Sequence, residues 1–369
     1  MKRLVLLGAG HAHLIVLREF AKSPPPDMEL VLITPSPWQY YSGMLPGWIS
    51  GHYTVDQCRI AVSPLVAEAG GELVLDSAVE LEADRREIRL AGGERIEYDL
   101  LSIDIGSHTN LDQLQGYRGR MISVKPIETF YPQWQQLQEQ SAGGRFGHLV
   151  VIGGGAAGVE LAMAAANALG VGSGQGCQLS LVAGESGPLP GFNRRMQRLA
   201  SQELSRLGVT LIEQRARAEE DGELCLADGT RLEADAIIAA TGASPARFLS
   251  NSGLTLDEQG FVLVGARHRS LSHPDVFAVG DTCSRQDRAL NRSGVHAVRA
   301  GPVLAENLRA ALNGSELKPF LPRRYSLYLL ACGGQSAIGS YGPLTFSGRW
   351  VWRLKDRIDR QFVEGFSGH

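Results

Sequence analysis

The 369-residue sequence lacks features that mark several large classes of protein. Its five cysteines are scattered, with neither Cys-x-x-Cys nor metal-ligand spacing, so we expect reduced thiols in a cytoplasmic protein and no metal site. No apolar run approaches the ~20 residues that span a bilayer. A predicted core strand, Leu4 to Leu7, starts directly after Lys2 and Arg3, which leaves no room for a signal peptide. The net charge of −3 provides no general attraction to nucleic acid.

Glycine, by contrast, is plentiful, with 44 residues, and many of them stand in recognisable turns. Hydrophobic residues make up 44% of the chain and charged residues 20%, as in soluble globular proteins. The length exceeds one ordinary core and predicts two or three domains.

A strand, a glycine turn and a helix follow one another in the middle of the chain. The apolar run from His148 to Ile152 predicts the strand, and an alanine-rich stretch from Val159 to Leu169 predicts the helix. Between them stand Gly153, Gly155 and Gly158 in a G-x-G-x-x-G pattern. In this context the glycines allow a tight turn, close approach of a pyrophosphate and packing of helix on strand. The helix N-terminus offers N–H groups to the phosphates.

The chain opens on a second copy of this pattern. A strand ending at Leu7 runs into Gly8-Ala9-Gly10-His11-Ala12-His13, with an apolar helix after it. His13 replaces the third glycine, so helix and strand are expected to approach less closely here. Each loop is followed by a hairpin-turn glycine, an aspartate six residues later and a glycine seven residues after that. These sets are Gly93, Asp99 and Gly106, and Gly229, Asp235 and Gly242. The identical spacing predicts two copies of one nucleotide-binding domain.

A third signature is the strand Val276 to Val279 with Gly280 and Asp281 at its end, and an apolar helix that Gly314 terminates. With both Gly loops it resembles the pyridine nucleotide-disulfide oxidoreductase superfamily of two-domain flavoproteins. The resemblance implies an α/β fold with two Rossmann-like, three-layer dinucleotide-binding domains, and FAD with NADH or NADPH as cofactors. It places the FAD domain at 1–117 and 245–320, the inserted NAD(P) domain at 118–244 and a short C-terminal strand and helix segment at 321–369.

The resemblance is strongest to the type II NADH dehydrogenase-like branch, through Gly153-Gly-Gly-Ala-Ala-Gly-Val-Glu160. Tyr41 to Gly47, Val124 to Pro126 and Trp350 to Asp359 resemble the oxidoreductase module found alone or fused to selenophosphate synthetase. The region from Thr34 to Gly47, where disulfide reductases carry a redox pair, contains no cysteine. The cofactor-binding residues expected are Gly8, Gly10, His11, Ala12, Leu45, Pro46, Val79, Gly106, Gly280, Asp281, His296, Ala297, Gly153, Gly155, Ala156, Gly158, Glu185 and Gly242. Asp281 would bind the ribityl chain, and the helix beginning near His296 and Ala297 would point at the flavin.

Three residues are candidates for chemistry, each with a plainer alternative. Glu160 lies near flavin and nicotinamide by resemblance, and in the first helical turn it also stabilises the helix dipole. Lys125 precedes Pro126 where the chain crosses between domains, and a surface lysine is the favoured alternative there. Cys332 reads more readily as a small buried hydrophobe than as a catalytic thiol. His11 and His13 more readily supply backbone N–H groups and packing than metal ligation. The ribose-binding acid is missing at the expected strand end, with Glu185 two residues late, so NADH and NADPH both stay open.

The C-terminal stretch has apolar residues at helical spacing: Val351, Leu354, Ile358, Phe362 and Phe366. Such a stripe either covers the core or lies at a membrane surface, which would place the cytoplasmic protein at the inner face of the membrane.

We expect an FAD-dependent NAD(P)H oxidoreductase with a small-molecule electron acceptor of the quinone type. The alternatives are reduction of a selenium or sulfur compound, with selenophosphate synthetase as partner, and a redox-responsive binding module with slow turnover.

Overall fold

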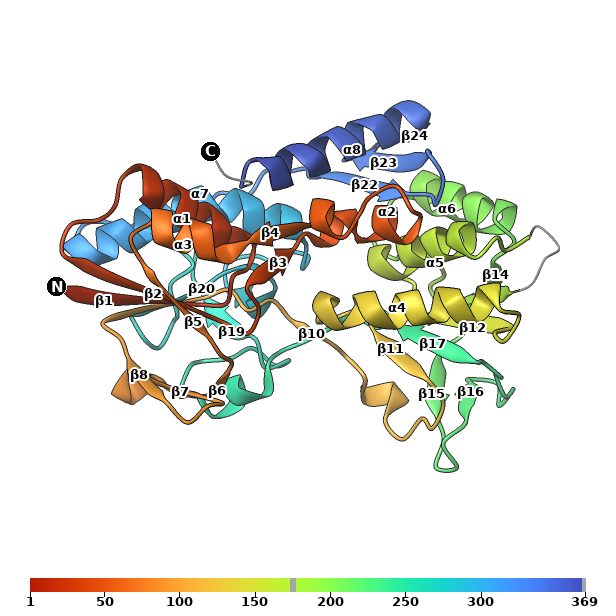
Figure 1. Cartoon of the computed structure of the whole chain (residues 1–369), viewed down its shortest axis with the longest axis horizontal. Coiled ribbons are helices and arrows are strands. Elements are labelled where there is room, and N and C mark those ends of the chain that lie inside the picture. Colours follow the sequence, from red (N-terminus) through yellow and green to blue (C-terminus); the bar gives the residue numbers. More distant parts are fainter. Residues whose placement is uncertain (173–176, 367–369) are drawn as a thin grey trace.

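The computed structural model describes residues 1–172 and 177–366 and contains two parallel five-stranded sheets side by side (Figure 1). The first has the order β20-β9-β1-β2-β5. Its strands are β1 (Lys2–Leu7), β2 (Met28–Thr34), β5 (Glu72–Leu75), β9 (Leu100–Ile103) and β20 (Val276–Ala278). In register, Leu4 of β1 lies between Leu30 and Leu100.

The second sheet repeats this plan in the order β11-β17-β12-β13-β14. Its strands are β11 (Met121–Ser123), β12 (His148–Ile152), β13 (Gln178–Val182), β14 (Thr210–Ile212) and β17 (Ala236–Ala239). In both sheets the strand before the Gly loop is central, and the strand before Gly106 or Gly242 pairs with it. The expected α/β fold with two copies of one domain is confirmed.

Helices cover one face of each sheet and small antiparallel sheets the other (Figure 1). Over the first sheet lie α1 (His11–Lys22), α3 (Val62–Glu68) and α7 (Gly294–Asn313). Over the second lie α4 (Ile127–Ala142), α5 (Ala156–Ala168) and α6 (Arg194–Arg206). The opposite faces carry β6 (Ala78–Glu82), β7 (Glu87–Leu90) and β8 (Arg95–Glu97), and β15 (Ala216–Ala218) with β16 (Leu224–Leu226).

The central strands are apolar throughout because both of their faces are buried. In β1, Leu4 and Leu6 join the core under the helices, and Val5 and Leu7 join the core above β6–β8. The helix-side core continues across both sheets, from Leu4 to Val151. The two domains therefore share one apolar layer beneath their helices.

Two chain crossings join the sheets, and at these crossings β10 (His108–Thr109) pairs with β18 (Ala243–Ser244). This pairing supports the domain division at 117/118 and 244/245, which we retain as a proposal. Shorter elements complete the first half: β3 (Trp38–Tyr40) pairs with β4 (Arg59–Ala61), β19 (Val262–Val264) pairs with β21 (Cys283–Arg285), and α2 (Leu45–Ile49) packs on α5.

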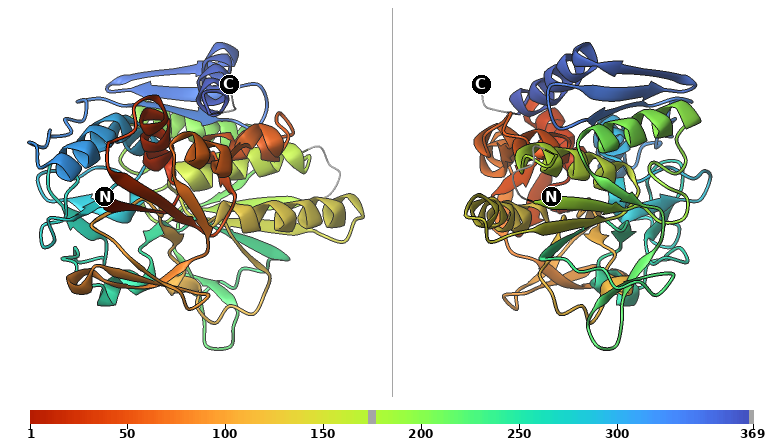
Figure 2. Two further views of the ribbon diagram at one scale, coloured as in Figure 1. Left: turned by 60° about the vertical axis from the view of Figure 1, so that its left-hand side comes forward. Right: turned by 90° about the vertical axis from the view of Figure 1, so that its right-hand side faces the viewer.

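The C-terminal segment forms a separate layer above both domains (Figures 1 and 2). It consists of β22 (Leu327–Ala331), β23 (Ala337–Tyr341), β24 (Leu344–Gly348) and α8 (Arg349–Glu364). The predicted stripe on α8 is only partly right: Val351 is buried, but Ile358 is 38% exposed, and Lys355 and Asp359 face inward instead. Among the described helices, none combines the length and apolar character that crossing a membrane requires.

Candidate active site

The first glycine of each loop lies directly against the end of a neighbouring strand. Gly8 has φ +89° and Gly153 has φ +135°. A Cβ on Gly8 would lie 2.5 Å from the carbonyl oxygen of Asp104, and one on Gly153 would lie 2.1 Å from that of Ala240. Asp104 stands two positions before Gly106, and Ala240 stands two positions before Gly242. Only glycine fits at either position, and the duplication therefore extends to backbone contacts.

The third glycine position of the loop is occupied by different residues in the two copies, Gly158 in one and His13 in the other. A Cβ on Gly158 would lie 1.9 Å from the Gly153 carbonyl oxygen, so this helix needs a glycine. In the first copy His13 is fully buried, and its Nδ1 donates to the Gly8 carbonyl at 2.6 Å. Its Nε2 accepts from the Ser102 hydroxyl at 2.8 Å, because burial lowers the pKa of His13 to about 4 and keeps it neutral. His13 thus hydrogen-bonds to the carbonyl that a glycine would pack against.

Asp104 is a buried carboxyl group directly beneath the first loop. It accepts hydrogen bonds from the backbone N–H groups of Ala12 at 2.9 Å and His13 at 3.1 Å. A Cβ on Gly10 would lie only 2.2 Å from the carboxyl carbon of Asp104. Burial raises the pKa of Asp104 to about 7. Sequence reasoning missed this residue, whose only signal is that the second copy has Ala240 at the same place.

Lys125 lies beside Asp281, with its Nζ 2.8 Å from the carboxylate and 2.9 Å from the Ser107 hydroxyl. The Thr282 hydroxyl donates to the carbonyl of Gly106 at 3.0 Å. The structure therefore brings together Lys125, Asp281 and the Gly106 turn from three distant parts of the sequence. The Lys125 side chain is 36% exposed, so this lysine is a partnered group at the edge of the site.

His11, the first residue of α1, lies close to the same cluster. Its ring contacts those of Tyr41 at 5.4 Å and Phe362 at 5.7 Å between centroids. Burial lowers its pKa to about 4, with opposing effects from Asp281 and Lys125. Within the described part of the chain, its buried Nε2 has no hydrogen-bond partner.

Glu160 forms the centre of a second buried polar cluster, where α5 meets the C-terminal layer. Its carboxylate accepts from the backbone N–H of Ala331 at 2.7 Å and lies 3.8 Å from Lys355 Nζ. Burial raises the pKa of Glu160 to about 7, against the effect of Lys355. Lys355 Nζ also donates to Asp359 and to the Gly43 carbonyl, each at 2.7 Å.

This second cluster reaches the first through aromatic contacts. Burial would lower the pKa of Lys355, but the carboxylates of Asp359 and Glu160 raise it, so the ammonium stays charged. The Tyr41 hydroxyl donates to Asp359, and the Tyr41 ring touches His11. Sequence reasoning missed Lys355 and Asp359, which share one helix face at i, i+4 spacing.

The other residues expected to bind FAD lie in different elements, and they differ in burial and in their distance from the Gly280–Asp281 turn. Leu45 and Pro46 are buried in α2, and the Cβ of Ala297 lies 3.5 Å from the Cβ position of Gly280. His296 is half-buried in the first turn of α7, whereas Val79 lies on the small β6 strand and is 40% exposed. Of these residues, the structure brings Ala297 to the Gly280–Asp281 turn.

The second Gly loop borders open space. A Cβ on Gly155, which precedes Ala156 at the start of α5, or on Gly242 would meet no described atom within 4 Å. Glu185 is 70% exposed in the following loop and lies 3.8 Å from Arg215. A second carboxylate, Glu213, approaches this loop at the Cβ position of Gly187, at 2.6 Å. Space for a dinucleotide with acidic groups nearby fits an NAD(P) site.

Cys332, the third catalytic candidate, is fully buried behind β22. Burial raises the pKa of its thiol, which disfavours the thiolate needed for chemistry. Its Sγ donates to the carbonyl of Leu330 at 3.7 Å. This environment favours the packing role over the catalytic one.

Comparison with known proteins agrees with this geometry. The family described as pyridine nucleotide-disulphide oxidoreductase matches residues 2–301. The NADH dehydrogenase-like protein YutJ of Bacillus subtilis is 22% identical over 292 residues, covering 77% of each chain. The demethylphylloquinone reductase NdbB of Synechocystis is 24% identical over 309 residues, covering 77% of this chain and 72% of that protein.

Among solved structures, NDH2 from Plasmodium falciparum in complex with NADH shares the fold, with a TM-score of 0.79 at 14% identity and 98% of each chain covered. The glycine loops and the Asp281 turn all lie inside the segment matched by the family. The chain therefore belongs to the pyridine nucleotide-disulphide oxidoreductase family, in its type II NADH dehydrogenase-like branch, and is an FAD- and NAD(P)H-dependent oxidoreductase.

Proposed function

We propose that this oxidoreductase passes electrons from NAD(P)H to a quinone-type acceptor. The observation that carries the proposal is the buried pair of Glu160 and Lys355, which joins the NAD(P) loop helix to the C-terminal layer. The similarity to a demethylphylloquinone reductase supports the same acceptor class.

The residues present fit both cofactors. Gly8, Gly10 and the backbone of His11 would hold the FAD pyrophosphate, and Asp281 would accept hydrogen bonds from ribityl hydroxyls. The loop of Gly153, Gly155, Ala156 and Gly158 would hold the NAD(P)H pyrophosphate. When bound, FAD supplies the redox chemistry by accepting hydride from nicotinamide and passing electrons on.

The protein's own contribution is to hold charge and protons near the acceptor. Reduction of a quinone to a quinol takes up two electrons and two protons. The hydride of NAD(P)H brings both electrons and one of the protons, so the site needs a donor for one further proton at neutral pH. Glu160, with its pKa raised to about 7, holds a proton there and returns to its anionic form beside Lys355. Lys355, fixed by Asp359 and Gly43, keeps a positive charge close to that carboxylate.

Stopped-flow spectroscopy of the FAD-bound protein tests this assignment. NADH or NADPH should bleach the flavin absorbance at about 450 nm, and a soluble quinone should restore it. In Glu160→Gln, bleaching should be unchanged, but reoxidation by quinone should slow by roughly 10²-fold or more and lose its pH dependence near 7. The exposed Glu364→Gln on α8 is the matched control.

Two outcomes would contradict the proposal. Flavin absorbance that persists after addition of either NADH or NADPH would refute NAD(P)H as the electron donor. Reoxidation by selenite or polysulfide in place of quinone would refute the quinone as acceptor and favour the selenium or sulfur alternative.

The Asp281→Ala variant should lose FAD, and full retention of FAD would refute the contact between Asp281 and the ribityl chain.

We also propose that the C-terminal layer touches the membrane surface. Its exposed apolar side chains include Leu344 at 62%, Trp350 at 56% and Tyr341 at 42%. Arg349, Arg353 and Arg357 lie on the same helix as Trp350, as expected for a segment at an anionic lipid surface. Liposome flotation should therefore depend on salt and weaken in Trp350→Ser with Leu344→Ser. Flotation unaffected by this double change would refute the contact.

A further inference from the structure

Two tyrosines connect the chain around α2 to α8, which lies above it in Figure 1. Tyr41 precedes the short helix η1 (Ser42–Met44), and its hydroxyl donates to Asp359. Tyr53 follows α2, and its hydroxyl donates to Asp356 at 2.7 Å. Both aspartates belong to α8. The two contacts are therefore alike in chemistry and differ in what else each aspartate binds.

The contact of Tyr53 belongs to a partly exposed ion pair. Asp356 also accepts a hydrogen bond from Arg360 at 2.9 Å, and the Arg360 guanidinium lies over the Tyr53 ring. The Asp356 side chain is 23% exposed. Asp356 therefore has a cation of its own and fixes α8 to the chain that follows α2.

The contact of Tyr41 belongs to the buried cluster around Glu160. Asp359 is 5% exposed and accepts from Lys355 at 2.7 Å, and Lys355 Nζ lies 3.8 Å from Glu160. The same ammonium donates to the carbonyl of Gly43, two residues after Tyr41. A Cβ on Gly43 would lie 2.8 Å from the Tyr41 ring and 3.2 Å from an oxygen of Asp359, so this glycine lets the chain close over the pair.

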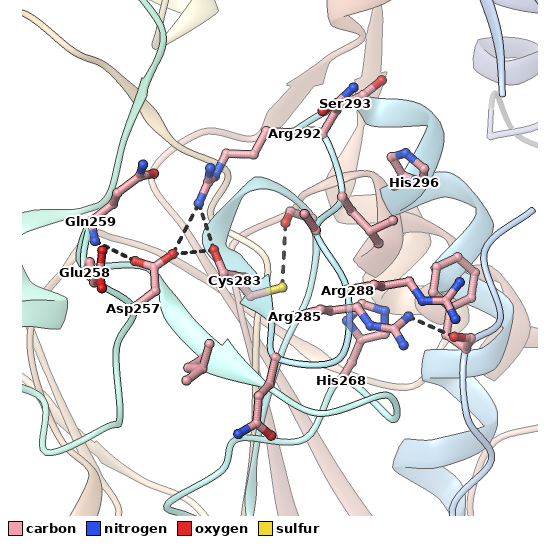
Figure 3. Close-up of a pocket in the computed structure, with 18 residues that line it drawn as sticks. Asp257, Glu258, Gln259, His268, Cys283, Arg285, Arg288, Arg292, Ser293 and His296 are labelled. Atoms are coloured by element: carbon pink, nitrogen blue, oxygen red, sulfur yellow. Dashed lines mark hydrogen bonds and ion pairs between the residues drawn. The ribbon is translucent and has the colours of Figure 1, made fainter. Parts of the chain in front are cut away.

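Two carboxylates compete for one ammonium in this cluster, because Glu160 and Asp359 share Lys355. At the cavity of about 500 Å³ shown in Figure 3, by contrast, Asp257 has the guanidinium of Arg292 at 3.7 Å. One carboxylate beside one cation favours both charged forms, whereas two carboxylates beside one cation favour a proton on one of them. Glu160 and Asp359 are therefore suited to hold one proton between them.

The hydrogen bond from Tyr41 favours the ionised form of Asp359. Burial raises the pKa of Asp359, but the Lys355 ammonium and the Tyr41 hydroxyl oppose this effect. Burial also raises the pKa of Glu160 to about 7, and the negative charge of Asp359 adds to that increase. With Asp359 ionised, the proton therefore resides on Glu160.

Further titratable side chains face these two carboxylates from the surrounding elements. They are Tyr41, Tyr53, Cys58, Cys332, Asp356 and Arg360. Burial raises the pKa of each tyrosine and each cysteine in this set, so these groups stay neutral near pH 7. Asp356 and Arg360 are paired with each other. The charges that act most directly on Glu160 are therefore those of Lys355 and Asp359.

We propose that Tyr41 is a positioning residue for proton delivery by Glu160: its hydroxyl group holds Asp359 as the anionic partner of Lys355 and leaves the proton to Glu160. This inference rests on the proposed role of Glu160 in quinone reduction. Glu160 gives one proton to the reduced quinone and regains one from water, and Tyr41 keeps its own proton throughout.

Quinone-driven reoxidation of the reduced, FAD-bound protein, followed by stopped flow from about pH 5 to about pH 9, tests this inference. In Tyr41→Phe, Asp359 loses a hydrogen-bond donor and takes up a proton more readily. Glu160 then loses a repelling charge and has Lys355 to itself, so the fall in rate with rising pH should move to lower pH by about half a unit or more. Asp359→Asn removes the charge outright and should move the profile in the same direction and at least as far.

Tyr53→Phe is the matched control, because it removes a hydroxyl donor to an aspartate of the same helix. Its pH profile should coincide with that of the unaltered protein, and urea unfolding checks that both phenylalanine variants fold. An unmoved profile in Tyr41→Phe or Asp359→Asn, or an equal shift in Tyr53→Phe, would overturn the inference and leave the role of Glu160 standing. A pH dependence near 7 that survives in Glu160→Gln would overturn the proposed function and this inference with it.

Discussion

Replacing Asp104 by asparagine should stabilise the FAD-free protein at neutral and alkaline pH. The Asp104 carboxyl is 3% exposed beneath the first Gly loop, and one of its oxygens accepts from two backbone N–H groups. An asparagine side-chain oxygen accepts the same two bonds, so the substitution removes only the ionisation. The difference between the pH profiles of the two proteins therefore reports the cost of charging this position.

The sign follows from the pKa, which burial raises from 3.8 to about 7. The folded state then binds more protons than the unfolded state between about pH 4 and pH 7, so stability falls as the pH rises through this window. Each tenfold change in a protonation equilibrium is about 1.4 kcal/mol, which gives on the order of 4 kcal/mol across the window. Asp104→Asn avoids this loss.

Urea unfolding of the FAD-free proteins from pH 4 to pH 8 is the measurement. The two proteins should have similar stability near pH 4 and diverge as the pH rises, with the variant more stable by a few kcal/mol at pH 8. Asp112→Asn, at an exposed carboxylate, should leave the pH profile unchanged. Parallel profiles for Asp104→Asn and the unaltered protein would refute the reasoning.

Three further substitutions test the loops and the buried pair. Gly158→Ala places a Cβ 1.9 Å from a carbonyl oxygen and should raise the KM for NADH at least tenfold while FAD is retained. His13→Ala leaves the Ser102 hydroxyl and a loop carbonyl without their partner and should cost about 1–3 kcal/mol in urea unfolding. Lys355→Met removes the cation beside Glu160, so it should destabilise by roughly 3–5 kcal/mol and shift the pH profile of quinone reduction upward.

Much of the fold was accessible from local patterns. The Gly loops, the spacing from Gly93 to Gly106 and its counterpart from Gly229 to Gly242 predicted two copies of one domain, and the paired sheets confirm them. A glycine turn between an apolar strand and a helix is a short-range signal, because its geometry is set by a few consecutive residues. The end of α7 at Gly314, with φ +70°, was predictable for the same reason.

The polar interior was less accessible, because its partners are far apart in the chain. The periodicity of α8 predicted an apolar inner face, yet Lys355 and Asp359 lie there since Glu160 and Tyr41 meet them from other elements. A buried charge is tolerated only with such partners, and a one-dimensional pattern does not show them.

The sequence by itself determined the two dinucleotide-binding domains and the place of each Gly loop. Tertiary structure alone decided that Asp104 lies under Gly10, that His13 takes the place of a glycine by bonding to the Gly8 carbonyl, and that Lys125 meets Asp281. The physical reason is the distance along the chain over which each effect acts. Turn and strand preferences act over neighbouring residues, whereas the protonation and partners of a buried group depend on every element packed around it.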